Sequence, residues 1–196
     1  GRHTLELRKQ GGGRLYWNAS LANFTMQDDL RAAGLEVRVE RKLYKLTPEK
    51  TKQLTAGARG QVTQQQGEKF TRTQVTNLAS VQSGDLVEVE LTLTSKNDYE
   101  YLLVTDPKAA GFEPVNVRSG YTDNELGAYV EYRDQSVNLF LRTLARGERS
   151  VSYRLRAETP GQFAALPTVV AAMYAPDLRG NSDEIRVKIR DRGTAE

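Results

Sequence analysis

The stretch Leu86-Val87-Glu88-Val89-Glu90-Leu91-Thr92-Leu93 decides the fold class of this chain. From Val87 onward every second residue is apolar, and the residues between are polar. Successive side chains of a β-strand point to opposite faces of a sheet, so this stretch has one apolar face and one hydrated face. Such strands are typical of antiparallel sheets packed on a single core. The stretch therefore predicts an antiparallel β-protein.

The same period of two recurs along the chain. Clear alternation is found at residues 35–39, 137–141, 151–158 and 185–190. Further strands are expected at residues 4–9, 14–22, 99–105, 128–133 and 163–174. Apart from Glu100, residues 99–104 are apolar or aromatic on both faces, which predicts a central strand. Glycine-containing turn signals separate the runs at residues 11–13, 83–85, 119–120, 146–147, 160–161 and 179–181. Many short alternating strands with such turns predict an all-β antiparallel β-sandwich.

Three regions depart from the strand pattern. Residues 25–34 predict one short helix of at most two turns, with Thr25 as N-cap and Gly34 at its end. Residues 47–80 are poor in large apolar side chains, and we expect a long loop with one edge strand near residues 75–81. Residues 1–24 resemble a hairpin around a glycine triplet. That hairpin either joins the sandwich or is the remnant of a preceding domain, because a lone hairpin is marginal in water.

The composition excludes several classes of function. The chain has 196 residues, no Cys, one His and a formal net charge of +3. It therefore has no disulfide, no thiolate metal site, no cysteine nucleophile and no pair of histidines for a metal. The one candidate histidine base, His3, lies at the N-terminus. We expect a non-enzyme without metal or cofactor and, since no apolar run approaches 18 residues, without a membrane-spanning helix. The first residue is Gly, so we expect a segment of a longer protein.

Positive charge is concentrated in residues 41–72, which contain eight basic and two acidic residues. A nucleic-acid interface would interleave such charges with stacking aromatic side chains. This region offers Tyr44 and Phe70 alone. Charge runs usually face water, so we expect a solvated loop and no nucleic-acid partner.

Carboxylates occur in patterns that could suggest chemistry. Glu88 and Glu90 fall on the hydrated face of their strand, which favours surface carboxylates over a general acid/base pair that requires burial. Three acidic clusters invite a calcium interpretation, at residues 97–100, 123–125 and 181–184. None matches an EF-hand loop, and turn formation explains Asn and Asp equally well. We therefore expect no metal site.

The cluster Ala172-Met173-Tyr174-Ala175-Pro176 is unusual. Met173 continues the phase of Val169 and Ala171, which predicts that it faces the core. Tyr174 lies on the opposite face, at a strand end stopped by Pro176. Either Tyr174 covers an edge of the sandwich, or it is an exposed aromatic residue that docks on a neighbouring domain.

Four sequence blocks, in order, resemble the carboxy-terminal region of bacterial alpha-2-macroglobulins over residues 35–190. The blocks are Ser83-Gly84-Asp85-Leu86-Val87, Ala110-Gly111-Phe112-Glu113-Pro114, Tyr153-Arg154-Leu155-Arg156-Ala157 with Thr159-Pro160-Gly161, and Met173-Tyr174-Ala175-Pro176. Residues 4–7 and 13–17 resemble strands that return from the thioester domain. The resemblance implies that residues 1–27 are returning strands of a CUB-type sandwich or a linker. Residues 28–196 would then form the last macroglobulin-like domain.

The resemblance also implies a function. These proteins trap proteases after cleavage of a bait region, which exposes a reactive thioester. The last domain helps to shield that bond, and the position of the shielding tyrosine is Tyr174, with Met173 beside it. The implied partners are the thioester and neighbouring macroglobulin domains of the parent chain, with target proteases reached through the intact parent. The implied location is the bacterial periplasm, cell envelope or exterior, with a membrane link only through a lipid anchor elsewhere in the parent.

Two features depart from this pattern, and one alternative stays open. The chain has no Cys, so it cannot itself form a thioester, and residues 47–80 are an insertion into a compact family pattern. The alternative is a cell-surface adhesion or carbohydrate-binding sandwich, for which the candidate aromatic cluster is Tyr121, Tyr129 and Tyr132. Alternation places Tyr132 on the apolar side of its strand.

Overall fold

The computed structural model describes residues 4–17, 30–49, 53–56, 62–65, 69–121 and 124–193. Every regular element in these ranges is a strand, and none is a helix. The strands are β1 (Ala33–Gly34), β2 (Val37–Pro48), β3 (Gln53–Ala56), β4 (Val62–Gln65), β5 (Phe70–Val75), β6 (Ser80–Gln82), β7 (Leu86–Ser95), β8 (Tyr99–Pro107), β9 (Phe112–Pro114), β10 (Gly120–Tyr121), β11 (Tyr129–Tyr132), β12 (Ser136–Leu144), β13 (Gly147–Ala157), β14 (Gly161–Ala165), β15 (Val169–Ala172), β16 (Arg179–Asn181) and β17 (Ile185–Arg190). Within the same ranges no helical segment is long and apolar enough to cross a membrane.

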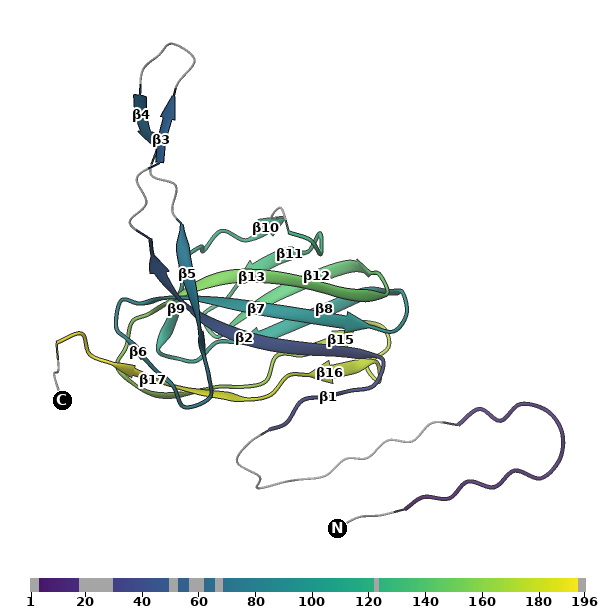
Figure 1. The fold of residues 1–196 in the computed structure, drawn as a ribbon. Coiled ribbons are helices and arrows are strands. Elements are labelled where there is room, and N and C mark those ends of the chain that lie inside the picture. Colours follow the sequence, from purple (N-terminus) through teal and green to yellow (C-terminus); the bar gives the residue numbers. More distant parts are fainter. Residues whose placement is uncertain are drawn as a thin grey trace.

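Two large sheets form the sandwich (Figure 1). The seven-stranded sheet has the order β1-β16-β15-β8-β12-β11-β10, and the five-stranded sheet has the order β5-β2-β7-β13-β9. Neighbouring strands within each sheet are antiparallel. The all-β sandwich is therefore confirmed. The strand predicted to be central, β8, is the middle strand of its sheet.

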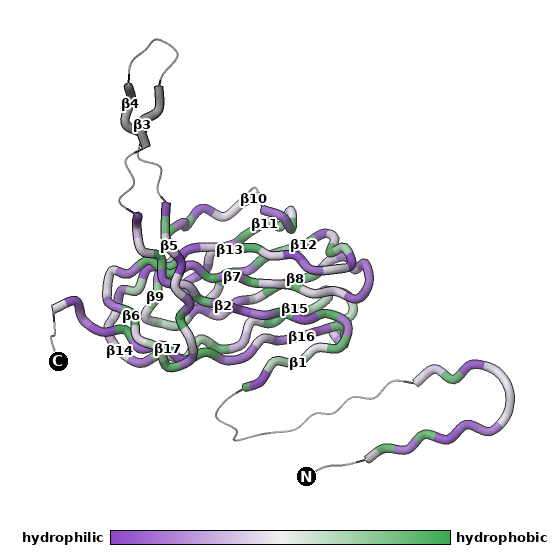
Figure 2. Tube along the Cα trace, viewed as in Figure 1, coloured by the Kyte–Doolittle hydropathy of each residue, from purple (hydrophilic) through white to green (hydrophobic). Residues whose placement is uncertain are grey.

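The core is built from the alternating residues that the sequence marked. Val87, Val89, Leu91 and Leu93 of β7 are at most 1% exposed, and Figure 2 shows apolar and polar residues alternating along the strands. Each buried apolar side chain contributes about 1.5–3 kcal/mol through removal from water. Leu35 is the exception among the predicted positions, because it precedes β2 and is 71% exposed.

A cluster of polar side chains lies inside this core. Arg41 of β2 donates from Nη1 to Oδ1 of Asp106 on β8 (2.7 Å) and from Nη2 to the carbonyl of Ala165 (2.7 Å). Asp106 also accepts hydrogen bonds from the Tyr153 and Thr168 hydroxyls. Burial raises the pKa of Tyr153 well above its ordinary value, and the negative charge of Asp106 adds to that rise. The cluster ties the two sheets together.

Much of the described part of residues 47–80, predicted to be a long loop, forms strands instead. β2 continues to Pro48 and pairs with β5, from Leu43 opposite Val75 to Pro48 opposite Phe70. β3 pairs with β4 as a second hairpin, which stands outside the sandwich in Figure 1. The expected strand at residues 75–81 is divided, because β5 ends at Val75 and β6 begins at Ser80. Tertiary pairing with β7 extends β2 despite its polar composition.

The single strand expected at residues 163–174 is also two strands. β14 pairs with β17 in a three-stranded sheet that β6 completes, whereas β15 pairs with β8 in the seven-stranded sheet. The turn expected at residues 179–181 is the strand β16, which pairs with both β15 and β1. Gly180 suits this position because a Cβ there would lie 2.3 Å from the carbonyl oxygen of Val37.

The predicted helix and the predicted N-terminal hairpin are not borne out where the chain is described. Residues 25–29, including Thr25, lie outside the described ranges, residues 30–32 form no regular element, and Ala33 and Gly34 are the strand β1. No strand is assigned in residues 4–17, whose side chains are exposed. Residues 18–22 and His3 lie outside the described ranges.

Candidate functional site

The unusual cluster around Tyr174 forms the turn of the β15–β16 hairpin. The Ala172 N–H donates to the carbonyl of Leu178 (2.9 Å), and the Leu178 N–H donates to the carbonyl of Ala175 (2.9 Å). The Met173 N–H donates to the carbonyl of Tyr101 on the neighbouring strand β8 (2.8 Å). Leu178 packs against the hydrophobic core. The turn is therefore fixed by backbone hydrogen bonds and one apolar anchor.

Tyr174 projects from this turn into solvent. Its side chain is 81% exposed, and its ring meets that of Tyr101 edge to face, with 5.5 Å between centroids and 80° between planes. Edge-to-face geometry places the positive edge of one ring against the negative face of the other. Tyr174 is thus an exposed aromatic side chain with a defined neighbour.

Met173 does not face the core, so that prediction is wrong. Met173 is 41% exposed, whereas Val170 and Ala172 are 0% and 6% exposed. Pairing with β8 sets this phase, because Val170 lies opposite Val104 and Ala172 opposite Leu102, both of which are buried. Met173 therefore lies beside Tyr174 on the accessible side of the hairpin end.

Tyr101 occupies an unusual backbone conformation for a residue within a strand. Its φ is 55°, in the left-handed region that bulky side chains rarely adopt. Tyr99 packs against the core, Glu100 and Tyr101 are exposed, and Leu102 is buried again. The alternation of buried and exposed residues is also broken at the same place in the paired strand β12, since Arg142 and Thr143 are both exposed between buried Leu141 and Leu144. The left-handed residue thus resets the alternation and returns Tyr99 to the core.

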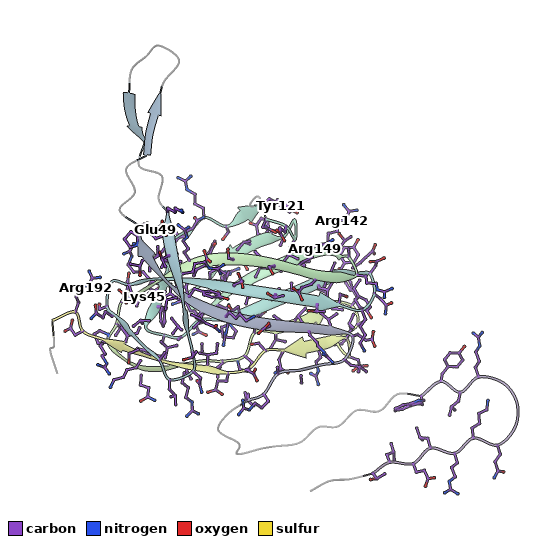
Figure 3. All side chains as sticks on the ribbon, viewed as in Figure 1. Lys45, Glu49, Tyr121, Arg142, Arg149 and Arg192 are labelled. Carbon is purple, nitrogen blue, oxygen red and sulfur yellow. The ribbon has the colours of Figure 1, made fainter. Side chains whose placement is uncertain are left out.

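A row of aromatic and apolar side chains crosses the outer face of the seven-stranded sheet. Ala171 lies opposite Leu103, Leu103 opposite Phe140, Phe140 opposite Tyr129, and Tyr129 opposite Tyr121. We call Leu103, Phe140, Tyr129 and Tyr121 the aromatic row. The ring centroids are 6.3 Å apart for Tyr129 and Phe140 and 5.3 Å apart for Tyr121 and Tyr129. Figure 3 labels Tyr121 at the upper edge of the sandwich, at the place of β10.

The outer face of the five-stranded sheet is chemically different. Arg72 pairs with Glu88 (3.0 Å) and Glu90 (2.7 Å), and its guanidinium lies 4.0 Å from the ring centroid of Tyr44. The hydrogen bond to Glu90 raises the pKa of Arg72. Glu88 and Glu90 lie on the outer face of the strand, as predicted, but both are paired with Arg72 and only partly exposed. Protein interfaces are enriched in aromatic residues and Met and depleted in Lys and Glu, so the face with the aromatic row is the better docking surface.

Residues of the three acidic clusters accept hydrogen bonds from backbone N–H groups. Asp98 accepts from the Arg146 N–H (2.7 Å), and Asp183 accepts from the Ala32 N–H (2.8 Å). Asn124 accepts from the N–H groups of Leu126 and Ala128. Asp123 lies outside the described ranges. In the described part of the chain no three His, Cys, Asp or Glu side chains form a group that could hold a metal ion.

The described parts of the basic region at residues 41–72 are mostly strands rather than a solvated loop. Lys45 pairs with Asp85 (2.6 Å) at the end of the sandwich where Arg192 also lies (Figure 3), and Lys69 pairs with Glu49 (3.6 Å). Arg41 is 6% exposed and belongs to the core cluster. The sequence does contain a signal for the burial of Arg41, because Arg41 follows Val37 and Val39 and precedes Leu43 at the period of two. Lys50, Lys52 and Arg59 lie outside the described ranges.

The aromatic trio named for carbohydrate binding is divided between the two faces of the sheet. Tyr121 and Tyr129 meet on the outer face with 80° between their ring planes. Tyr132 lies on the core side, 6.4 Å from the ring centroid of Tyr153, as alternation predicted. Perpendicular rings do not form the flat platform on which a sugar ring would stack.

These observations define a β-sandwich domain whose seven-stranded sheet has aromatic side chains on its outer face. Residues 34–177 match the family of bacterial alpha-2-macroglobulin MG10 domains, and the chain belongs to this family. It thereby falls within a non-catalytic protease-inhibitor family.

Three similar proteins place this domain in context. The chain is 25% identical over 187 residues to circularly permutated Ras protein 2 of Dictyostelium discoideum, with 94% of the chain covered. It is 23% identical over 202 residues to an alpha-2-macroglobulin homologue of Nostoc, with 98% covered. The crystal structure of a tyrosine-to-glycine mutant of Salmonella alpha-2-macroglobulin matches 81% of the chain and 10% of that protein, with 22% identity and a TM-score of 0.55. The chain spans 4% of the Dictyostelium protein and 10% of the Nostoc protein.

Proposed function

We propose that this domain docks on the thioester domain of a protease-trapping parent chain and shields the thioester with Tyr174. The observation that carries the proposal is the contrast at the hairpin turn. Tyr174 is 81% exposed, yet the backbone on both sides of it is fixed by hydrogen bonds at Met173 and Leu178. A large aromatic side chain on a fixed turn can fill a pocket of a partner with little loss of conformational entropy.

Shielding is physically sound because a thioester reacts with water and with amines. An aromatic ring seated over the bond would exclude both. The chain has no Cys, so the thioester belongs to another part of the parent. The domain's contribution is then steric and needs no catalytic group.

Met173 is assigned as support for Tyr174. It is 41% exposed and follows Ala172, the last residue of β15, so it lies beside Tyr174 where a docked domain would touch both. A thioether on an unbranched side chain adapts to irregular apolar surfaces. Met173 would therefore fill space around the ring rather than hold it from inside the core.

The aromatic row is assigned to the same docking face. Leu103 and Tyr101 both lie on the outer side of β8, two residues apart, so the row begins beside the Tyr174 pair. The row crosses β8, β12, β11 and β10, a width of about 14 Å at the usual spacing of strands. A standard interface covers about 800 Å² on each partner, which accommodates the hairpin turn and the row together.

The remaining assignments are those that the family resemblance implies. Residues 1–27 would complete a CUB-type sandwich in the parent, and residues 28–196 would form the docking domain. The parent would reach target proteases through its bait region, in the bacterial periplasm or cell envelope.

The test uses the full-length parent. Tyr174→Ala should increase the rate at which methylamine inactivates the thioester several-fold, because the amine gains access to the bond. Tyr44→Ala is the matched control, since Tyr44 lies on the charged outer face beside Arg72. An inactivation rate for Tyr174→Ala equal to that of the control would remove the shielding function.

A further inference from the structure

We infer that Tyr101 is the positioning residue for Tyr174, fixing both the backbone and the ring of the exposed tyrosine from the neighbouring strand. The inference rests on the proposed function and adds a second residue to it. Tyr101 would not touch the thioester. It would determine where the Tyr174 ring points before the domains meet.

The first observation is the backbone of Tyr101. Its φ of 55° is left-handed, and among the described residues Leu78, with φ 64°, is the other non-glycine residue of this kind. Glycine adopts this region without strain, whereas a tyrosine does not. Strained backbone conformations concentrate at functional sites, where the strained residue supplies something that glycine cannot. At position 101, the group that glycine would lack is the aromatic ring that meets Tyr174.

The second observation is that Tyr101 contacts the hairpin turn in two ways. Its carbonyl accepts the Met173 N–H at 2.8 Å, which extends the β15–β8 register one residue beyond Ala172 and Leu102. Its ring meets that of Tyr174 at 5.5 Å between centroids. One residue therefore holds the backbone preceding Tyr174 and the side chain of Tyr174.

The third observation is that the break in the alternation of β8 directs the Tyr101 side chain outward. Because Tyr99 and Leu102 both face the core, Glu100 and Tyr101 are both directed outward, toward the end of the hairpin. Tyr101 is itself 43% exposed, so its ring is available to Tyr174 rather than occupied by the core. Without that contact, an 81% exposed tyrosine would sample several rotamers, and docking would have to select one.

The experiment compares four variants of the full-length parent by their rate of thioester loss to methylamine. Tyr174→Ala is the reference for an absent shield. Tyr101→Gly removes the ring and relieves the backbone strain, Tyr101→Phe keeps the ring, and Leu78→Gly relieves equivalent strain at a distant turn. We expect Tyr101→Gly to increase the rate at least two-fold, with Tyr101→Phe and Leu78→Gly at the wild-type rate.

A second measurement separates positioning from loss of fold. In the 196-residue chain, the NMR ring-proton shifts of Tyr174 should move toward random-coil values in Tyr101→Gly, while the melting temperature stays at or above that of the wild type. A wild-type rate for Tyr101→Gly, alongside a raised rate for Tyr174→Ala, overturns the inference and leaves the proposed function standing. Wild-type rates for both variants remove the proposed function and the inference together. A rise in Leu78→Gly equal to that in Tyr101→Gly also overturns the inference.

Discussion

Arg41 Nη1 and Asp106 Oδ1 lie 2.7 Å apart in the interior, one from each large sheet, with side chains that are 2% and 1% exposed. The pair is desolvated, so each charge depends on the other and on the surrounding hydrogen bonds. Asp106 also accepts from the Tyr153 and Thr168 hydroxyls, which belong to two further parts of the sandwich. This cluster joins the sheet that carries the hairpin turn to the opposite sheet.

Asp106→Asn should reduce the free energy of unfolding by about 3–5 kcal/mol, because it leaves the guanidinium of Arg41 buried without a compensating charge. Urea unfolding of the 196-residue chain measures this loss. The double variant Arg41→Met/Asp106→Leu should lose less than Asp106→Asn, since it removes both charges. Glu49→Gln, which breaks the exposed pair with Lys69, is the control and should have a far smaller effect. A loss in Asp106→Asn no greater than in the control would contradict this account of the core.

Stability should fall at alkaline pH through Tyr153. Burial and the nearby Asp106 raise the pKa of Tyr153 in the native state, whereas a tyrosine in the unfolded chain ionises near pH 10. Because the native-state pKa is the higher one, this stabilisation is fully present below about pH 10 and is lost as the pH rises further. The free energy of unfolding should therefore decline between about pH 10 and pH 11.5 more steeply in the wild type than in Tyr153→Phe. Urea unfolding measures this free energy. If it declined equally in the wild type and in Tyr153→Phe across that pH range, the pKa of Tyr153 would not be raised in the native state.

Gly180→Ala should destabilise the hairpin strand β16. The added Cβ would lie 2.3 Å from the carbonyl oxygen of Val37 and 3.1 Å from that of Ala33, and backbone atoms cannot move aside as a side chain can. We expect a loss of about 1–3 kcal/mol, the usual cost of overpacking. Gly12→Ala is the matched control, because a Cβ there meets no atom within 4 Å. Thermal unfolding compares the two variants, and equal melting temperatures would contradict the close approach of β16 and β2.

Local alternation predicted the sandwich but not the pairing that determines which side chains face the core. β7 satisfies alternation at every position, so its core residues could be read directly. The prediction that Met173 faces the core is wrong because the phase of β15 is set by its partner β8, and because residues 163–174 contain two strands rather than the single one expected. Tyr101 could not be predicted, since a left-handed residue within a strand has no local sequence signal when it is not glycine.

The high content of basic residues in residues 41–72 also led to a wrong prediction. The basic composition of residues 41–72 predicts a solvated loop that includes Arg41. The position of Arg41 in the alternation of β2 instead places it with Val39 and Leu43 in the core. Its partner Asp106 lies 65 residues away in sequence, so only the folded chain brings the two together. The strands in residues 47–80 were missed for a related reason, because their pairing with β2 and with each other outweighs a composition typical of loops.

Hydroxyl-radical footprinting measures whether the end of the β15–β16 hairpin docks on another domain of the parent, as we propose. Mass spectrometry would compare oxidation rates at Met173 and Tyr174 in the uncleaved parent and in the 196-residue chain alone, with Tyr44 on the charged face as the internal reference. Met173 and Tyr174 are 41% and 81% exposed in the domain, so both should be oxidised readily there. We expect the oxidation rates of Met173 and Tyr174 to fall several-fold in the parent, while the rate of Tyr44 is unchanged. Equal rates at Tyr174 in the parent and in the chain alone would contradict it.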